Sequence, residues 1–507
     1  FEKRYGYDPV TGNSAMPVPK DPGNGEGFKY SDLVSYANAM DQLSGQEIEE
    51  NRFASFYGAL DYSLFDRYVL NVSFRTDGSN NFGSDEQFNP TWSAGAVWHV
   101  SEETFMEVVR PVLSRLSLRV ATGYTGNINK TVKPNLMMKY YKNFRISDDE
   151  NYRMGYINNA PNPKLRWEKT RDVKVALDFG LWKDRINGIV EAYWRKSKDC
   201  VTSEYVPVTT GFFNQSYNTS VLQNNGVEFS LSVAVLKSKD YNLSVSANVA
   251  WNQNKLKKYN SPNTSLALDK YVGYPMGAVF SGKYEGIDPE TGMYKFKLRP
   301  DAVTNKDGYL REPNNYYYYL GTSVAPFTGG FNLNFSYKNI GLSVGGSYSV
   351  KAKMVDNIES PAGYELLSGS KLESIPTPHN DLYRNHLNVK REVRNRWTPE
   401  NRTGVKYPRL IDAYGKKLGL DLTNPTLTTI TRGALLEDIS YLRINTIALS
   451  YSLPQRVLER INFSSAALNL TLNNFFTITK YSGIDPEVPG ATYPVSRSVT
   501  IGLNVGF

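Results

Sequence analysis

Cysteine and histidine are almost absent from this sequence of 507 residues, which contains Cys200 alone and three histidines, His99, His379 and His386. A single cysteine excludes an intrachain disulfide and any metal site built from several cysteines. His379 and His386 stand near Asp381, but a metal site would need further ligands that this spacing does not supply. The GxSxG, P-loop, GxGxxG and HExxH patterns are missing too, so we expect no metal, no cofactor and no enzymatic activity.

Long apolar runs and strong net charge are also missing. No run of about 18 apolar residues occurs, which excludes a helical membrane protein. The net charge of +8 arises from 58 basic and 50 acidic residues without a basic tract, so nothing points to nucleic acid. The small basic excess suits anionic lipid headgroups, and it is equally compatible with scattered solvated charge. Aromatic residues are plentiful at 13%, as in interfacial girdles and in carbohydrate-binding surfaces.

The last ten residues alternate strictly between apolar and small or polar side chains and end on Phe507. This pattern is typical of the closing strand of a transmembrane β-barrel, in which one side of each strand faces lipid and the other a polar lumen. An edge strand of a soluble sandwich also alternates, so the strand does not decide between the two architectures by itself.

The same alternation recurs along the chain and predicts about 14 strands with apolar faces of about five residues, the length that a tilted membrane-spanning strand requires. Thirteen of these strands are expected at residues 52–64, 67–75, 91–100, 114–125, 172–181, 185–197, 227–235, 241–252, 331–337, 340–351, 441–453, 466–479 and 498–507, and a weaker one at 278–286.

The connections between these strands alternate between short and long. Short ones fall at residues 65–66, 183–184, 237–240 and 338–339, and long ones at 126–164, 198–219, 253–277, 287–325, 354–434 and 480–496. Short periplasmic turns and long outer loops are typical of outer-membrane barrels, whereas a sandwich has no reason to place all its long loops at one end. We therefore expect an all-β transmembrane antiparallel β-barrel, with residues 454–460 as a short cap on its periplasmic rim.

The long loops contain the candidate binding residues. Four aromatic residues in a row, Tyr316, Tyr317, Tyr318 and Tyr319, offer a stacking platform for sugars, although packing of the loop on its neighbours explains them equally well. Trp397 lies in a loop of about 80 residues that is expected to fold on itself. The substrate-binding candidates are therefore Tyr316, Tyr317, Tyr318 and Trp397.

Two Asp-Pro-Glu sequences occur, at residues 288–290 and 485–487. Their oxygen atoms are of a kind that calcium binds, but Asp-Pro commonly forms a plain turn, and the turn is the preferred interpretation.

The beginning of the sequence has a different character. Residues 1–50 include no charged segment followed by an apolar one, and residues 7–27 are rich in Pro, Gly, Asp and Asn, like the interior of a loop. We expect residues 1–50 to be a loop or the remainder of an extracellular segment, and residues 51–507 to be the C-terminal part of the barrel.

A set of short stretches along the chain follows the motifs of a known family. The first two are residues 75–79 (RTDGS) with 82–83 (FG), similar to RxDGSSRFG, and residues 98–105 (WHVSEETF), similar to AWxxSEExF. Further matches follow in the same order at residues 124–127, 165–170, 177–180, 225–229, 327–330, 396–401, 436–442, 473–477 and 483–487. As a set they resemble the SusC/RagA class of TonB-dependent outer-membrane transporters, and the resemblance covers roughly residues 50–507.

The resemblance implies a 22-strand barrel that surrounds an N-terminal plug domain. It also implies a TonB-contacting segment ahead of the plug, and a SusD-like surface lipoprotein that closes the outer mouth. The plug, the TonB-contacting segment and roughly the first eight strands are missing from this sequence. Since open sheet edges are not tolerated in lipid, we expect the missing part to be a second chain or an N-terminal half.

The function that the resemblance implies is energised import of an oligomeric nutrient across the outer membrane of a Gram-negative bacterium. Oligosaccharides are favoured over peptides, and a passive porin is a third alternative. Expected partners are the SusD-like lipoprotein on loops 126–164, 287–325 and 354–434, the TonB complex, the N-terminal barrel and plug segment, and lipid with lipopolysaccharide. Calcium, if any, would belong to the loops or to the lipoprotein.

The alternation also predicts which face each side chain occupies. Val175, Leu177, Phe179, Val245 and Val249 are expected to face lipid, and Lys174, Asp178, Ser244 and Ser246 the lumen. Residues 498–507 are expected to pair with the strand at 466–479 and not with residues 52–64.

Overall fold

The computed structural model describes residues 2–4, 46–48, 51–127, 132–147, 150–212, 214–259, 271–290, 292, 294–302, 316–355, 395–405, 432–489 and 493–507. Strands account for most of this part of the chain. The one α-helix among the described residues, α5 (Gln455–Arg460), has six residues and lies in the predicted cap at 454–460. No described helix is both long enough and apolar enough to cross a membrane.

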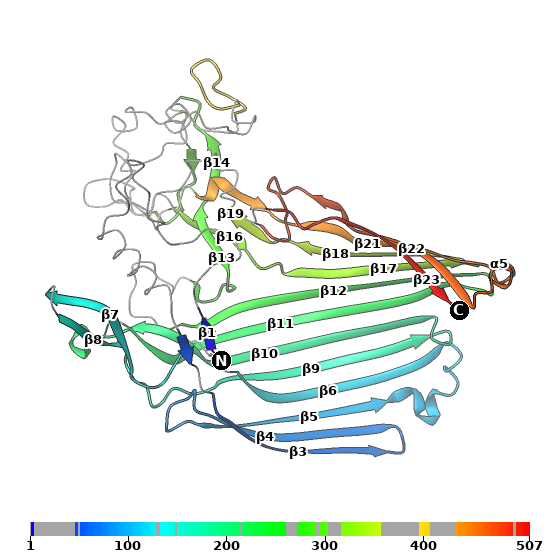
Figure 1. The fold of residues 1–507 in the computed structure, drawn as a ribbon, viewed down its shortest axis with the longest axis horizontal. Helices are drawn as coiled ribbons and strands as arrows, with labels where there is room; N and C mark the ends of the chain where they lie inside the picture. Colours follow the sequence, from blue (N-terminus) through cyan, green and yellow to red (C-terminus); the bar gives the residue numbers. More distant parts are fainter. Residues whose placement is uncertain are drawn as a thin grey trace, which may run out of the picture.

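Thirteen strands form a single antiparallel sheet in which each strand lies beside its neighbours in the chain (Figure 1). They are β3 (Phe53–Leu64), β4 (Tyr68–Ser79), β5 (Phe88–His99), β6 (Leu113–Asn127), β9 (Glu168–Leu181), β10 (Ile186–Tyr205), β11 (Asn214–Lys237), β12 (Tyr241–Lys258), β17 (Phe327–Tyr337), β18 (Ile340–Val350), β21 (Tyr441–Ser452), β22 (Ser465–Thr479) and β23 (Ser498–Gly506). These thirteen coincide with the thirteen strong predictions from alternation.

The predicted strand at 278–286 is not part of this sheet. It divides into β13 (Ala278–Gly282), which pairs with β16 (Tyr317–Thr322), and β14 (Tyr284–Ile287), which pairs with β15 (Tyr294–Phe296). Together with β19 (Lys353–Val355) and β20 (Leu436–Asp438), these short strands rise above one end of the sheet (Figure 1). The described sheet therefore has one strand fewer than the 14 that alternation predicted. The short apolar run at residues 278–286 is explained by packing within the loops.

Two other described strand pairs and one extended hairpin complete the structure. The hairpin of β7 (Met137–Ser147) and β8 (Glu150–Asn159) projects from the same end of the sheet, and β1 (Glu2–Arg4) pairs with β2 (Gln46–Ile48). The predicted loop at 198–219 is largely a continuation of the β10–β11 hairpin, which is paired from Ile186↔Val233 to Tyr205↔Asn214. Alternation did not predict this extension, because polar residues occupy both of its faces. The backbone pairing between the two strands nevertheless continues.

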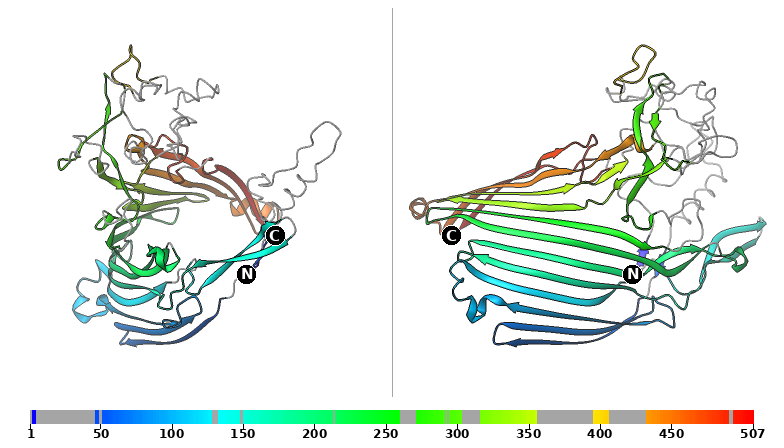
Figure 2. Two further views of the ribbon diagram at one scale, coloured as in Figure 1. Left: turned by 90° about the vertical axis from the view of Figure 1, so that its left-hand side faces the viewer. Right: turned by 180° about the vertical axis from the view of Figure 1, so that it is seen from behind.

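The sheet curves into an arc whose two ends are β3 and β23, which do not pair with each other (Figure 2, left). β23 pairs with β22 from Ser465↔Gly506 to Asn473↔Ser498, as predicted. The Phe507 ring, one residue beyond the last pair, packs edge-on against Phe463 at 5.2 Å between ring centroids. Among the described residues, neither edge strand therefore has a partner strand on its outer side.

The two faces of the arc differ as the alternation predicts. The cross-strand pairs Val175↔Val120 and Leu177↔Leu118 lie on one face, and Val245↔Val233 continues that face along the arc. Lys174, Asp178, Ser244 and Ser246 lie on the opposite face, since directly paired residues share a face. Cavities lie over the polar face, including one lined by Ser230, Ser232, Ser246 and Asn248. The predicted separation of these side chains onto two opposite faces of the sheet is confirmed.

The connections at the two ends of the strands also differ as predicted. At one end, turns such as Phe65-Asp66 have positive φ at both central residues, +53° and +52°, which is the type I′ geometry that matches the twist of paired strands. The longest excursions, together with the additional short strands that the structure describes, lie at the opposite end (Figure 1).

Glycines in the sheet make room for aromatic side chains of the neighbouring strand. A Cβ at Gly226 would overlap the Tyr193 ring and lie 2.6 Å from the Trp251 carbonyl oxygen, whereas a Cβ at Gly95 would meet nothing closer than 3.8 Å. On the other face, the Tyr348 ring lies across Gly329 and its hydroxyl donates to the Asn248 carbonyl at 2.8 Å. The glycines in residues 225–229 and 327–330 are therefore explained by packing.

We predict that Gly226→Ala destabilises the barrel by about 1–3 kcal/mol, because the added methyl group meets a ring and a backbone carbonyl that cannot both retreat. Thermal unfolding of the full protein in detergent measures the loss. Gly95→Ala, in the same sheet and on the same face, is the matched control and should change the free energy of unfolding by less than about 0.5 kcal/mol. Equal effects of the two substitutions would contradict this explanation.

Candidate functional site: the polar face of the sheet and its loop end

Charged side chains from β6, β9 and β10 form a group of ion pairs on the concave, polar face, here called the charged wall. Its pairs are Arg119–Asp178 at 2.6 Å, Arg195–Asp172 at 2.9 Å and Lys174–Glu191 at 3.4 Å. Each pair joins neighbouring strands, because alternate residues of a strand face the same side. Charges of this kind are costly against lipid, so the charged wall marks the water-facing side.

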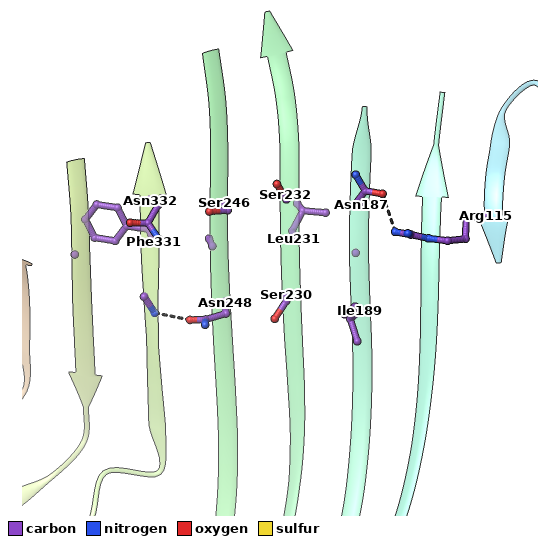
Figure 3. Close-up of a pocket in the computed structure, with 14 residues that line it drawn as sticks. Arg115, Asn187, Ile189, Ser230, Leu231, Ser232, Ser246, Asn248, Phe331 and Asn332 are labelled. Carbon is purple, nitrogen blue, oxygen red and sulfur yellow. Dashed lines mark hydrogen bonds between the residues drawn. The ribbon is translucent and has the colours of Figure 1, made fainter. Parts of the chain in front are cut away.

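The neighbouring part of the concave face carries small and uncharged polar groups. A shallow cavity of about 330 Å³ extends across β10, β11, β12 and β17 and is lined by Asn187, Ser230, Ser232, Ser246, Asn248 and Asn332, with Gly330 and Gly346 (Figure 3). The Asn248 Oδ1 accepts the backbone N–H of Gly330 at 2.5 Å. Apart from Arg115 at its edge, this surface has no charged side chain among its lining residues and is rich in amide and hydroxyl groups.

Arg115 connects the charged wall with this uncharged surface. It starts from β6, passes over β9 and donates from Nη2 to Asn187 Oδ1 on β10 at 2.8 Å (Figure 3). Gly180 of β9 makes the crossing possible, since a Cβ there would lie 3.2 Å from the Arg115 Cβ and would overlap the Asp184 carboxylate. This explains the glycine in residues 177–180.

At the loop end, four aromatic rings form a cluster, here called the mouth cluster: Tyr271, Tyr274, Phe280 and Tyr319. The Tyr274 ring lies 4.9 Å from both Phe280 and Tyr319, and Tyr271 lies 4.8 Å from Phe280. Pairing of Phe280 with Tyr319 between β13 and β16 brings them together. Tyr274 and Tyr319 are 37% and 41% exposed, so rings of the cluster are accessible for stacking.

The predicted binding residues have different positions. Tyr317 and Tyr318 are half buried in β16, and the Tyr318 hydroxyl donates to the Leu298 carbonyl at 2.8 Å. Tyr316 immediately precedes that strand and is also half buried. The Trp397 side chain is only 7% exposed and donates from Nε1 to the Pro289 carbonyl at 3.0 Å. The structure thus brings Tyr319, the fourth residue of the run, to Tyr274, which no sequence signal connected with it.

The turn interpretation of residues 288–292 agrees with the hydrogen bonds. Asp288 Oδ1 accepts the N–H of Glu290 at 2.8 Å, and its carbonyl accepts the N–H of Gly292 at 2.8 Å. Pro289 of this turn is the partner of Trp397, so the turn supports the matching stretch 396–401 in space.

The second Asp-Pro-Glu sequence takes part in a buried ion pair. Arg443 of β21 contacts Asp485, and its Nη1 lies 2.8 Å from Glu487 Oε2; the Arg443 and Asp485 side chains are 3% and 6% exposed. Asp485 also accepts the backbone N–H groups of Glu487 at 2.9 Å and Val495 at 3.2 Å. We call this arrangement the Arg443 latch, because it fastens the β22–β23 connection to the sheet.

A β-bulge directs the chain toward this latch. Between the pairs Ile444↔Phe476 and Thr446↔Asn473, β22 contains one residue more than β21, and Asn474 adopts a positive φ of 59°, which Asn tolerates well. The Asn474 Nδ2 donates to the Ser496 carbonyl at 3.0 Å. Residues 473–477 and 483–487 thus act together to position the β22–β23 connection.

A further pair of matching stretches forms an aromatic contact near the loop end. The Phe82 ring stacks on Trp167 at 4.5 Å between centroids, and both are nearly buried, at 5% and 6% exposure. The N–H of Gly83 donates to the Leu165 carbonyl at 2.9 Å, and a Cβ at Gly83 would overlap the Pro163 carbonyl. Many of the matching residues therefore hold connections in place.

The histidines show no metal-binding arrangement in the part of the chain that the structure describes. His99 Nδ1 lies 3.0 Å from Ser117 Oγ, and His379 and His386 fall outside the described residues. Among the residues placed, no group of three or more His, Cys, Asp or Glu side chains has a suitable geometry.

A curved, two-faced antiparallel sheet with its longest excursions at one end is typical of transmembrane β-barrels. The family profile described as "TonB dependent receptor-like, beta-barrel" matches residues 5–370, and the chain belongs to this family of outer-membrane proteins.

Relatives agree with that membership. The chain is 27% identical over 488 residues to "TonB-dependent receptor SusC" of Bacteroides thetaiotaomicron, covering 90% of this chain and 44% of that protein. It is 26% identical over 498 residues to "TonB-dependent receptor P26" of Formosa agariphila, covering 90% and 46%. The structure titled "Structure of the RagAB peptide transporter" matches with a TM-score of 0.72 and 25% identity over 92% of this chain and 49% of that chain. The resemblance to the SusC/RagA class is confirmed, and the chain spans about half the length of the relatives it matches.

We predict that Arg443→Ala lowers the free energy of unfolding by about 3–5 kcal/mol, because it leaves the Asp485 carboxylate buried without its cation. Chemical unfolding of the full protein measures this, and protease cleavage within residues 480–497 should become faster. Arg299→Ala removes a cation from the exposed Arg299–Asp301 pair, at 2.7 Å, and should change stability by less than about 1 kcal/mol. A similarly small effect of Arg443→Ala would show that the latch does not fasten this connection.

The latch also predicts an acid dependence. Burial by itself raises the pKa of Asp485, but hydrogen bonds from the Glu487 N–H, from Arg443 and from the Val495 N–H outweigh burial, and the net pKa lies below its usual value. A carboxyl group with a lowered pKa stabilises the fold above its unfolded pKa, and this contribution is lost as the pH falls through the folded pKa. Residues 480–497 should therefore resist pepsin at a pH of about 4 and become cleavable only in stronger acid. Cleavage that increases as the pH falls from about 6 to about 4 would contradict a lowered pKa of Asp485.

Proposed function

We propose that this chain forms the C-terminal part of the barrel of an energised, TonB-dependent outer-membrane importer for an oligomeric nutrient. The observation that carries the proposal is the two-faced arc of a TonB-dependent receptor barrel. Its convex face is apolar, and its concave face combines the charged wall with a surface rich in amide and hydroxyl groups. Such an interior suits passage of a hydrated, polar substrate.

The open edges support the existence of further strands. Unpaired N–H and C=O groups in a bilayer cost several kcal/mol each, so β3 and β23 need partners. About nine further strands would bring the sheet to the 22 of plugged transporters. We place these strands, the plug and the TonB-contacting segment in an N-terminal part or a second chain.

The substrate we propose first is an oligosaccharide. The mouth cluster favours it, because exposed tyrosine rings stack on the apolar faces of sugars, and the small amide and hydroxyl groups of the interior offer neutral hydrogen-bond partners. A peptide is the second candidate, favoured by the mixed charges of the charged wall and by the likeness to the RagAB peptide transporter.

A SusD-like surface lipoprotein is the proposed partner at the mouth. The parts of loops 126–164 and 287–325 that the structure describes build the β7–β8 hairpin and the small sheets above the end of the barrel wall, and residues 395–405 of loop 354–434 join them through Trp397. A stable contact with such a partner would bury at least about 1,000 Å².

Energy dependence tests the proposed activity. In cells that make the full protein, uptake of the nutrient should stop when a protonophore collapses the proton gradient, because TonB transmits that energy. A control substrate that enters through ordinary porins should still cross the outer membrane. Uptake that continues unchanged would identify a passive porin instead.

The substrate class is tested at the mouth cluster. Replacing both tyrosines, Tyr274→Ala with Tyr319→Ala, should weaken binding of the cognate oligosaccharide by roughly tenfold, since stacked rings contribute about 1 kcal/mol or more. Tyr337→Ala, at the opposite end of the barrel and 43% exposed, is the matched control and should leave binding unchanged. Binding of peptides, but of no oligosaccharide, by the unmodified protein would favour the second candidate.

A further inference from the structure

The connection between β5 and β6, residues 100–112, exposes a set of apolar side chains. It contains the short 3-10 turns Val100–Glu102 and Thr104–Met106. Phe105 is 64% exposed, Val108 88%, Val109 43% and Val112 52%. The connection lies at the short-turn end of the sheet, where most other connections consist of a few residues. An exposed apolar group of this size in a compact segment points to an apolar partner.

Hydrogen bonds fix the side of the sheet on which this segment begins. The Glu103 carboxylate accepts the Tyr68 hydroxyl at 2.5 Å, the Trp98 Nε1–H at 3.1 Å and an N–H of Arg67 at 3.2 Å. Tyr68 and Trp98 are cross-strand partners, and Trp98 pairs in turn with Leu118, which places these residues on the apolar face. The segment therefore starts on the convex side, and the light-blue chain lies outside the arc (Figure 2, left).

The segment is held in one conformation by its polar groups. The Arg110 Nε donates to the Ser101 carbonyl at 2.9 Å, and the Trp182 N–H donates to the Val112 carbonyl at 2.7 Å. Ser101 is buried, and Glu103 is 9% exposed. The polar attachments of the segment face the sheet, while its apolar side chains remain uncovered.

We propose that residues 100–112 insert into the inner leaflet of the outer membrane, where phospholipid acyl chains cover Phe105, Val108, Val109 and Val112. The exposed apolar side chains continue the lipid-facing surface of β5 and β6. Tyr68, Trp98 and Trp182, which are 44%, 37% and 51% exposed, have the amphipathic character of side chains at a membrane interface. Glu102, Glu107 and Arg110, in the same segment, suit the level of the headgroups. The proposal does not depend on what the protein transports.

Site-directed spin labelling tests the insertion. The full protein, with its other cysteines replaced, including Cys200→Ser, carries a nitroxide at Val108→Cys and is reconstituted into phosphatidylcholine vesicles. Collisions with oxygen, which concentrates in lipid, are compared with collisions with a water-soluble nickel chelate. At Val108 the ratio of oxygen to nickel collisions should exceed that of the control Lys239→Cys, in the exposed β11–β12 turn, at least several-fold.

Two results would overturn the proposal. Nickel access equal to that of the Lys239 control would place the segment in water. Exclusion of both reagents would mean that protein, either another part of the molecule or a second copy, covers the segment. If Val108→Cys fails to assemble, Val109→Cys provides a second site in the same segment, to which the same criteria apply.

Discussion

The need to satisfy every backbone N–H and C=O group in a medium without water determines most of this structure. It requires the thirteen sheet strands to pair continuously, and it makes alternation of side chains the only means of separating lipid from lumen. Once Val175 and Leu177 face outward, Lys174 and Asp178 have no other side available to them than the concave one. Their ion pairs with Glu191 and Arg119 follow from that placement, because each charge finds its partner on the adjacent strand.

The same constraint explains how much of the fold the sequence could predict. Period-two alternation located the thirteen strands, their faces and the pairing of the last strand, since each of these is a local property of a lipid-facing strand. It did not predict that β10 and β11 continue as a hairpin to Tyr205 and Asn214, because outside the membrane nothing requires one face to be apolar. It also misplaced residues 278–286, whose apolar character arises from packing against β16.

The functional surface was less predictable for a different reason. The mouth cluster combines Tyr274 with Tyr319, and the Arg443 latch combines a strand residue with a distant turn. Contacts between segments that lie far apart in the chain produce no repeating pattern in a single sequence. The aromatic run at Tyr316–Tyr319 did indicate the right region, but backbone pairing in β16 determines which ring joins the cluster. Trp397 illustrates the opposite case, since its bulk secures two loops to each other and leaves little of the ring accessible.

The order of the strands has a consequence for assembly. Because each sheet strand pairs only with the sheet strands before and after it in the chain, most contacts of the sheet close a short stretch of chain, and the connections 259–326 and 351–440 are the longest exceptions. The sheet can therefore grow largely by one hairpin at a time, whereas β17 and β21 pair with strands that lie much earlier in the sequence. A nascent chain of this kind can enter a membrane progressively. At each stage, the strand that was added last forms the edge of the sheet on that side and is the strand that the next one pairs with.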